Sequence, residues 1–120
     1  MAARTILNLK KNDHISEGLR SLHWLPVEKR IEYKVLLLTW KCQNGMAPAY
    51  LQNLLSVRQC AHFTRSIKAQ ELYVPRVNLS TFGDRAFSMI APKLWNDFPT
   101  QIRDIKSLES FKRSLKTILF

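Results

Sequence analysis

The longest helical pattern in the chain covers residues 26–44, PVEKRIEYKVLLLTWKCQN. Pro26 suits the first position of a helix, where its missing N–H costs nothing. Glu28 and Lys41 lie toward the start and the end of the pattern, as the helix dipole favours. Asn44-Gly45 then supplies residues that tolerate positive φ, which a helix end requires. These signals predict one long helix that begins at Pro26 and ends at Asn44.

The apolar residues of this stretch predict how the helix packs. One set follows the 4-4-3-4 spacing of a single helical face: Val27, Ile31, Val35, Leu38 and Cys42. We expect that face to be buried, with Cys42 as an inert core thiol. Leu36, Leu37 and Trp40 extend the apolar surface to other sides. The helix should therefore be central and covered on more than one side.

Shorter elements are predicted before and after it. Residues 2–25 contain signals for one short helix and for a second that ends near Leu22, with Asp13 or Ser16 as its cap. Pro48 opens another short helix. Residues 71–77 form an extended strap, which lies at an edge because Pro75 cannot donate to a central ladder.

Two further helices are predicted in the last third of the chain. Thr81 caps the first, whose apolar stripe is interrupted by Pro92, so we expect a kink or a split there. Phe98-Pro99 ends it. Ser107 caps a C-terminal helix with these residues facing inward: Leu108, Phe111, Leu115, Ile118 and Leu119. Residues 1–120 are thus expected to form one mainly α domain with a long central helix, a basic loop and a short extended strap.

The charge of the chain favours an anionic partner. It has 19 Lys+Arg against 9 Asp+Glu among 120 residues, a formal net charge of +10. Such an excess suits RNA, DNA or an acidic protein face, although charge spread for solubility is the alternative. The densest local excess of positive charge lies in residues 58–76, where Glu71 is the single acidic residue. This stretch supplies the candidate nucleic-acid-binding residues: Arg58, Arg65, Lys68 and Arg76. Phe63 and Tyr73 are close enough in sequence to stack on bases there.

Candidates for catalysis and for cofactors are nearly absent. No two acidic residues are adjacent, and the three glycines are far apart, so neither a magnesium-binding aspartate pair nor a phosphate-cradling loop is present. Cys60 and His62, with His14, His23 or Cys42, would be the metal candidates, but they lack paired-cysteine spacing. His23 lies between Leu22 and Trp24, where a structural imidazole is expected. We expect no catalytic residue, no metal and no cofactor.

The apolar runs are too short for a membrane helix. The longest covers only Val35 to Leu38, whereas a span needs about 20 residues. The start of the chain lacks the apolar core of a signal peptide. We therefore expect an intracellular protein, nuclear or cytoplasmic, with no membrane partner.

Three stretches together carry a family resemblance. They are Ser21–Val27 with Arg30–Lys34, Phe82–Ser88 with Ala91–Asn96, and Ser107–Lys112 with the ending Leu119-Phe120. In this order and at these spacings the chain resembles the region that follows the reverse transcriptase core in non-LTR retrotransposons of the jockey/CR1 type. The linking pieces Ala47–Leu51 and Val74–Arg76 also match.

The resemblance implies a helical C-terminal segment of a longer ancestor, which handled template RNA or target DNA. The ancestor would be an RNA-directed DNA polymerase, but no residue of this chain matches a polymerase or endonuclease catalytic motif. The Cys/His zinc knuckle that some relatives carry in this region is also missing. The resemblance therefore also implies a polymerase core as a partner of this chain. Two alternatives stay open: a fragment with no selected function, and a host-adopted basic protein-interaction module.

Overall fold

A computed structural model of the chain describes residues 2–58, 70–76, 78 and 83–120. Among these residues it contains helices and no strand, so the predicted mainly α class with one long central helix is confirmed. The elements are α1 (Ala2–Ile6), α2 (Ser16–Ser21), α3 (Val27–Gln43), α4 (Ala49–Gln52), the 3₁₀-helix η1 (Gly83–Arg85), α5 (Phe87–Asp97), α6 (Thr100–Arg103) and α7 (Leu108–Leu119). Most of the predicted basic loop lies outside the described residues.

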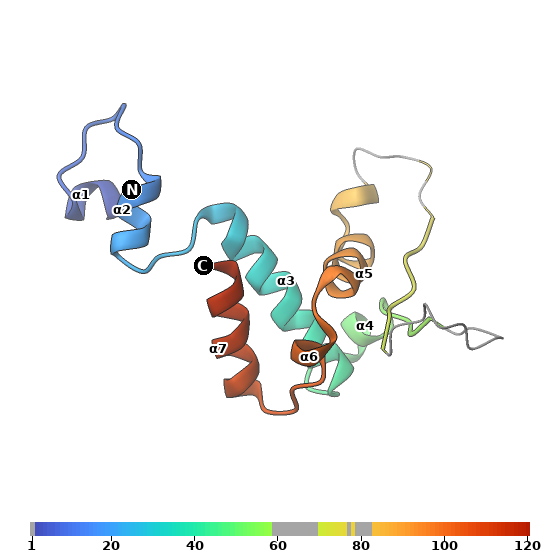
Figure 1. The fold of residues 1–120 in the computed structure, drawn as a ribbon. Helices are drawn as coiled ribbons and strands as arrows, with labels where there is room; N and C mark the ends of the chain where they lie inside the picture. Colours follow the sequence, from blue (N-terminus) through green and yellow to red (C-terminus); the bar gives the residue numbers. More distant parts are fainter. Residues whose placement is uncertain (1, 59–69, 77, 79–82) are drawn as a thin grey trace.

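Three helices form the body of the molecule. The central helix α3 lies between α5 and α7 and contacts both (Figure 1). Because α3 and α7 run in opposite directions, the C-terminal end of α7 lies beside the start of α3. The two short helices α1 and α2 pack on each other and lie apart from this body, beyond the start of α3. The segment between α2 and α3 therefore joins two separate parts of the fold.

The core is built around stacked aromatic rings. Trp40 of α3 is fully buried, and its ring lies 5.5 Å from that of Phe111 of α7, with an angle of 23° between the planes. Trp95 of α5 contacts the same phenyl ring at 6.2 Å. The indole Nε1 of Trp40 donates a 2.8 Å hydrogen bond to the carbonyl of Ile105. The three main helices thus meet at one aromatic cluster, in which the buried indole N–H of Trp40 has a hydrogen-bond acceptor.

The buried face of α3 differs from the predicted one. Val27 and Ile31 are 68% and 54% exposed, and Leu38 is also exposed, whereas Leu36 and Trp40 are buried in the core. The four consecutive apolar residues from Val35 to Leu38 cover every side of the helix, so spacing alone does not select a face. The positions of α5 and α7 select it. The prediction that the 4-4-3-4 face is buried was therefore wrong, except at Cys42.

Both ends of α3 are where the sequence predicts them. Pro26 directly precedes the helix, and Gly45 follows it with φ of +69°. The Gly45 N–H donates to the carbonyl of Cys42, and the Met46 N–H donates to that of Lys41 over 2.8 Å. This pair of bonds is a Schellman motif. Burial raises the pKa of the Cys42 thiol, as suits an inert core cysteine.

The later helices confirm some of the expected ends, but the start of α5 was predicted too early, because Gly83–Arg85 form the separate 3₁₀-helix η1 and α5 begins at Phe87. Helix α5 ends at Asp97, before Phe98-Pro99, and α7 follows Ser107. Pro92 does not split α5, which runs from Phe87 to Asp97 with the buried Pro92 at its middle. Ile118 is 47% exposed, so its predicted inward position was wrong. The predicted cap Thr81 lies outside the described residues.

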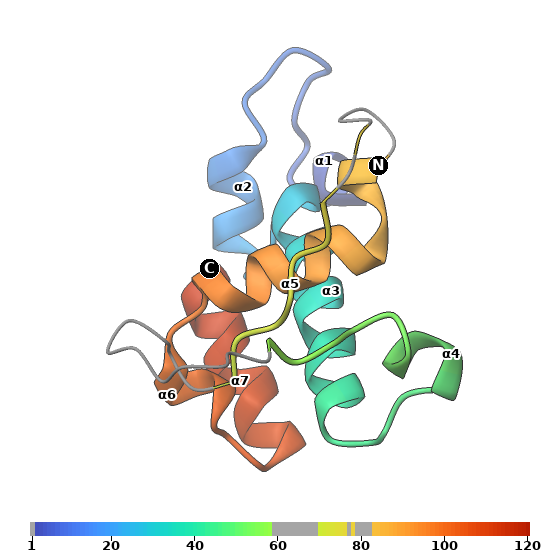
Figure 2. The same ribbon diagram turned by 90° about the vertical axis from the view of Figure 1, so that its right-hand side faces the viewer.

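The predicted strap is extended and crosses α5 (Figure 2). Leu72 is 1% exposed, and both of its backbone groups bond to the side-chain amide of Asn96 on α5, each over 2.8 Å. On its other side Leu72 forms an antiparallel bridge with Val57. The amide of Asn96 therefore takes the place of a neighbouring strand, which lets one extended segment be pinned to a helix.

Candidate nucleic-acid interface

The structure describes only part of the predicted basic site. Arg65 and Lys68 lie outside the described residues, while Arg58 and Arg76 are described and exposed. The Arg58 guanidinium pairs with the Glu71 carboxylate at 3.3 Å, which neutralises part of the expected excess. Arg58 also lines a hollow of about 260 Å³ with Leu72, Tyr73, Val74 and Asn96. Arg76 does not line this hollow.

A second cationic region lies where the segment between α2 and α3 meets α3 and α7, and it begins with a left-handed turn at His23. The His23 N–H donates to the carbonyl of Arg20, and the Trp24 N–H donates to that of Leu19 over 2.8 Å. Helix α2 thus ends in the same Schellman motif as α3. Its left-handed position is taken by His23, with φ of +53°, instead of a glycine.

A side chain at this position has an energetic cost. Left-handed backbone costs a residue other than glycine about 1 kcal/mol or more, and Gly45 avoids that cost at the end of α3. The His23 ring is exposed and lies 5.6 Å from the ring of Phe120. His23 is therefore not the internal structural imidazole that its apolar neighbours predict.

Two adjoining hollows open around His23. The first, of about 320 Å³, is lined by His23, Trp24, Leu25, Arg30 and Lys116. The second, of about 680 Å³, is lined by His23, Arg113, Lys116, Thr117 and Phe120. Because His23 and Lys116 line both, the hollows form one continuous site, which we call the basic cleft. Each hollow contains one large aromatic side chain and at least two cations.

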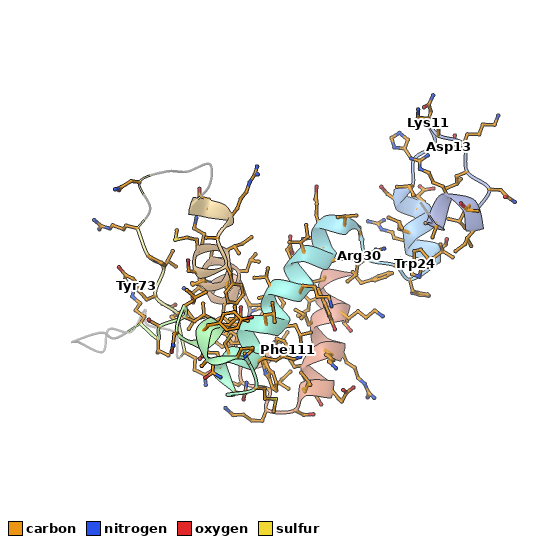
Figure 3. The ribbon with its side chains drawn as sticks, turned by 180° about the vertical axis from the view of Figure 1, so that it is seen from behind. Lys11, Asp13, Trp24, Arg30, Tyr73 and Phe111 are labelled. Carbon is orange, nitrogen blue, oxygen red and sulfur yellow. The ribbon has the colours of Figure 1, made fainter. Side chains whose placement is uncertain are left out.

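The cations of the basic cleft come from α3 and α7. Arg30 donates from Nε to the carbonyl of Leu25 over 2.7 Å, and its guanidinium carbon lies 6.0 Å from the centre of the Trp24 ring. Figure 3 shows these two side chains together where the segment after α2 meets the start of α3. Arg113 and Lys116 are exposed neighbours on α7, one turn apart.

Among the described residues, no acidic side chain forms an ion pair with these three cations. The four ion pairs among the described residues join Lys29 to Glu32, Arg58 to Glu71, Lys93 to Asp84 and Lys112 to Glu109. In that part of the chain no acidic side chain pairs with Arg30, Arg113 or Lys116, and none lines either hollow. Among the described residues, the basic cleft therefore holds more unpaired positive charge than the region around Arg58, which favours the approach of an anion.

The arrangement suits a ligand that combines negative charge with flat rings. Arginine and lysine bind phosphate oxygens, and exposed aromatic faces stack on bases. The described residues contain no group of three His, Cys, Asp or Glu side chains that could hold a metal ion. Cys60 and His62 lie outside the described residues. No helix among the described residues is long and apolar enough to cross a membrane.

Sequence reasoning missed the basic cleft because its parts are distant in the chain. Trp24 and Lys116 belong to opposite ends of the sequence and come together only when α7 packs against α3. One signal was available in the sequence: Arg113 and Lys116 lie on the outward side of the predicted C-terminal helix. Comparisons with protein-family models, with curated proteins and with solved structures find no match to the chain.

Proposed function

We propose that the chain is a non-catalytic nucleic-acid-binding segment that contacts RNA or DNA through the basic cleft. The observation that carries the proposal is the group of three cations without carboxylate partners among the described residues, set between two exposed aromatic rings. The formal net charge of +10 and the resemblance to the region after a reverse transcriptase core support the same class of ligand. Arg58, Arg65, Lys68 and Arg76 are proposed as a second contact region.

Charge reversal in the cleft tests this function. Replacing Arg113 and Lys116 together by glutamate is expected to weaken binding of a labelled oligonucleotide at least tenfold, because two attractions become two repulsions. Fluorescence anisotropy over a salt series measures both affinity and slope. Each phosphate contact contributes about 0.7–0.9 to the slope of log affinity against log salt, so the variant should have a shallower slope.

A matched pair elsewhere separates the cleft from net charge. Arg85→Glu with Lys106→Glu makes the same charge change at exposed positions away from the cleft, and it should retain most of the affinity. Arg58→Glu with Arg65→Glu measures the contribution of the second region. Equal losses in the cleft pair and the matched pair would contradict the proposed site. Absence of binding by the unmodified chain at low salt would contradict the function itself.

A second candidate function is supported by the exposed apolar side of α3. Val27 and Ile31 are more than half exposed on the central helix, next to the less exposed Leu38. Such a row on a central helix suits a protein partner. We propose the polymerase core of a jockey/CR1-type element as that partner, in line with the resemblance.

Co-expression with such a core tests the second function. The two proteins should elute together, and Val27→Ser with Ile31→Ser should abolish co-elution because the variant removes the apolar contact area. Tyr50→Ser on α4 is the control, since Tyr50 is 69% exposed but lies on another helix. Co-elution that survives the α3 variant, or is lost equally with the control, would contradict this docking surface.

A further inference from the structure

We propose that the basic cleft binds single-stranded nucleic acid, with unpaired bases stacked on Trp24 and Phe120. This inference rests on the proposed nucleic-acid-binding function and adds the form of the ligand. It follows from three features of the cleft: where its aromatic rings lie, how its cations are spaced, and what residue forms the turn between α2 and α3.

The aromatic rings are exposed where ordinary packing would bury them. Trp24 is 37% exposed and Phe120 is 45% exposed, whereas Trp40 and Trp95 are 0% and 1% exposed. Each exposed ring lines its own hollow and has a cation beside it. In a duplex each base face is covered by the neighbouring base pair, so the bases cannot stack on these rings. An unpaired base of a single strand can stack on them.

The cations are too few and too localised for a duplex groove. Arg30 lies at the first hollow, Arg113 at the second, and Lys116 lines both. This spacing places at least two positive charges at each of the two adjoining hollows. A short single strand can follow it, with its phosphates at the cations and its bases in the hollows. The volumes of about 320 and 680 Å³ are in the range that small-molecule ligands occupy.

The turn at His23 holds the platform in place. Two backbone hydrogen bonds close the turn, and His23 lies between the hollows with its ring near Phe120. A glycine would form the turn at lower cost, as Gly45 does after α3. The imidazole stands at a left-handed backbone position and adds a third ring where the two hollows adjoin.

Tryptophan fluorescence tests the proposal on the unmodified chain. Trp40 and Trp95 are buried, so quenching by an added oligonucleotide reports mainly on Trp24. A 12-residue single strand, as RNA and as DNA, should quench the emission, and the duplex of the same sequence at equal concentration should quench it much less. Strong quenching by the duplex, or none by either single strand while anisotropy shows binding, would overturn the stacking proposal and leave the proposed function intact.

Aromatic variants without charge change give the second measurement. Trp24→Leu and Phe120→Leu should each weaken single-strand binding about tenfold, since base stacking on one ring is of that order, and should change duplex binding less than twofold. His23→Gly retains the turn and removes the ring, with a smaller expected loss. Tyr50→Leu is the matched control, because Tyr50 on α4 is 69% exposed and lines neither hollow of the basic cleft.

The outcomes distinguish failure of base stacking from failure of nucleic-acid binding as a whole. Equal losses for single strand and duplex in the aromatic variants, or unchanged single-strand binding in both, would overturn stacking even if Arg113→Glu with Lys116→Glu still reduces binding. Loss of binding in Tyr50→Leu equal to that in Trp24→Leu would also overturn it. Failure of the unmodified chain to bind any oligonucleotide at low salt would remove the proposed function together with this inference.

Discussion

Replacing Trp40 by alanine is expected to destabilise the chain by about 3–5 kcal/mol, the usual cost of removing a large aromatic side chain from a core. Trp40 is fully buried, stacks on Phe111 and donates to the carbonyl of Ile105. The variant loses all three contributions and leaves a cavity at the point where α3 and α7 meet. Domains are stable by only about 5–15 kcal/mol, so this loss removes a large part of the total stability. Urea unfolding followed by circular dichroism measures the change.

Two variants make this result specific. Trp24→Ala removes the same side chain from a partly exposed position and should destabilise the chain much less than Trp40→Ala. Trp40→Phe retains a ring in the core but leaves the Ile105 carbonyl without its donor, so it should cost about 1–3 kcal/mol. Similar stabilities for Trp40→Ala and Trp24→Ala would show that the aromatic cluster does not hold the helices together in solution.

The same experiment bears on the alternative that the chain is a fragment without selected function. A fragment whose apolar faces need a missing polymerase core should unfold without a sharp transition. A cooperative transition of the unmodified chain, lost in Trp40→Ala, would instead indicate a self-sufficient core. The exposed Val27 and Ile31 would then be surface residues of a folded domain available to a partner, and not part of an incomplete core.

The ends of the central helix were predictable because they depend on local chemistry. Pro26 and Gly45 act through their own backbone preferences, and the structure places both where the sequence does. The buried face of α3 was not predictable in the same way. It depends on which sides of α3 are covered by α5 and α7, and the apolar run from Val35 to Leu38 is compatible with more than one buried face. Local signals thus determine where this helix begins and ends, while long-range packing determines how it is turned.

The site likewise has features that the sequence shows and features that only long-range packing creates. The excess of cations and the outward position of Arg113 and Lys116 are visible in the sequence. The sequence does not show that those residues lie close to Trp24 and His23, because this proximity needs the antiparallel packing of α7 on α3. His23 was misjudged for a related reason. Apolar neighbours predict burial, but the end of α2 places the residue in a left-handed turn that exposes its ring.

Replacing Arg103 by methionine is expected to stabilise the chain by about 1–3 kcal/mol, opposite in sign to most core substitutions. Arg103 ends α6 and is only 3% exposed. Among the described residues its Nε and Nη2 atoms have no hydrogen-bond partner, and Nη1 donates to the Gln70 carbonyl at 3.4 Å. No carboxylate among the described residues pairs with it. A buried cation without satisfied donors costs free energy that an apolar chain of similar length does not.

Few favourable contacts are lost in this variant. The Gln70 carbonyl still accepts from Nε1 of Trp95 at 3.3 Å, so removing the guanidinium leaves no new buried group without a partner. Methionine fills the space of the arginine stem. Urea midpoints of Arg103→Met and of the exposed control Arg113→Met measure the effect, with the control expected within about 0.5 kcal/mol of the unmodified chain. A loss of more than about 1 kcal/mol in Arg103→Met alone would show that the guanidinium is paired in solution with a group outside the described residues.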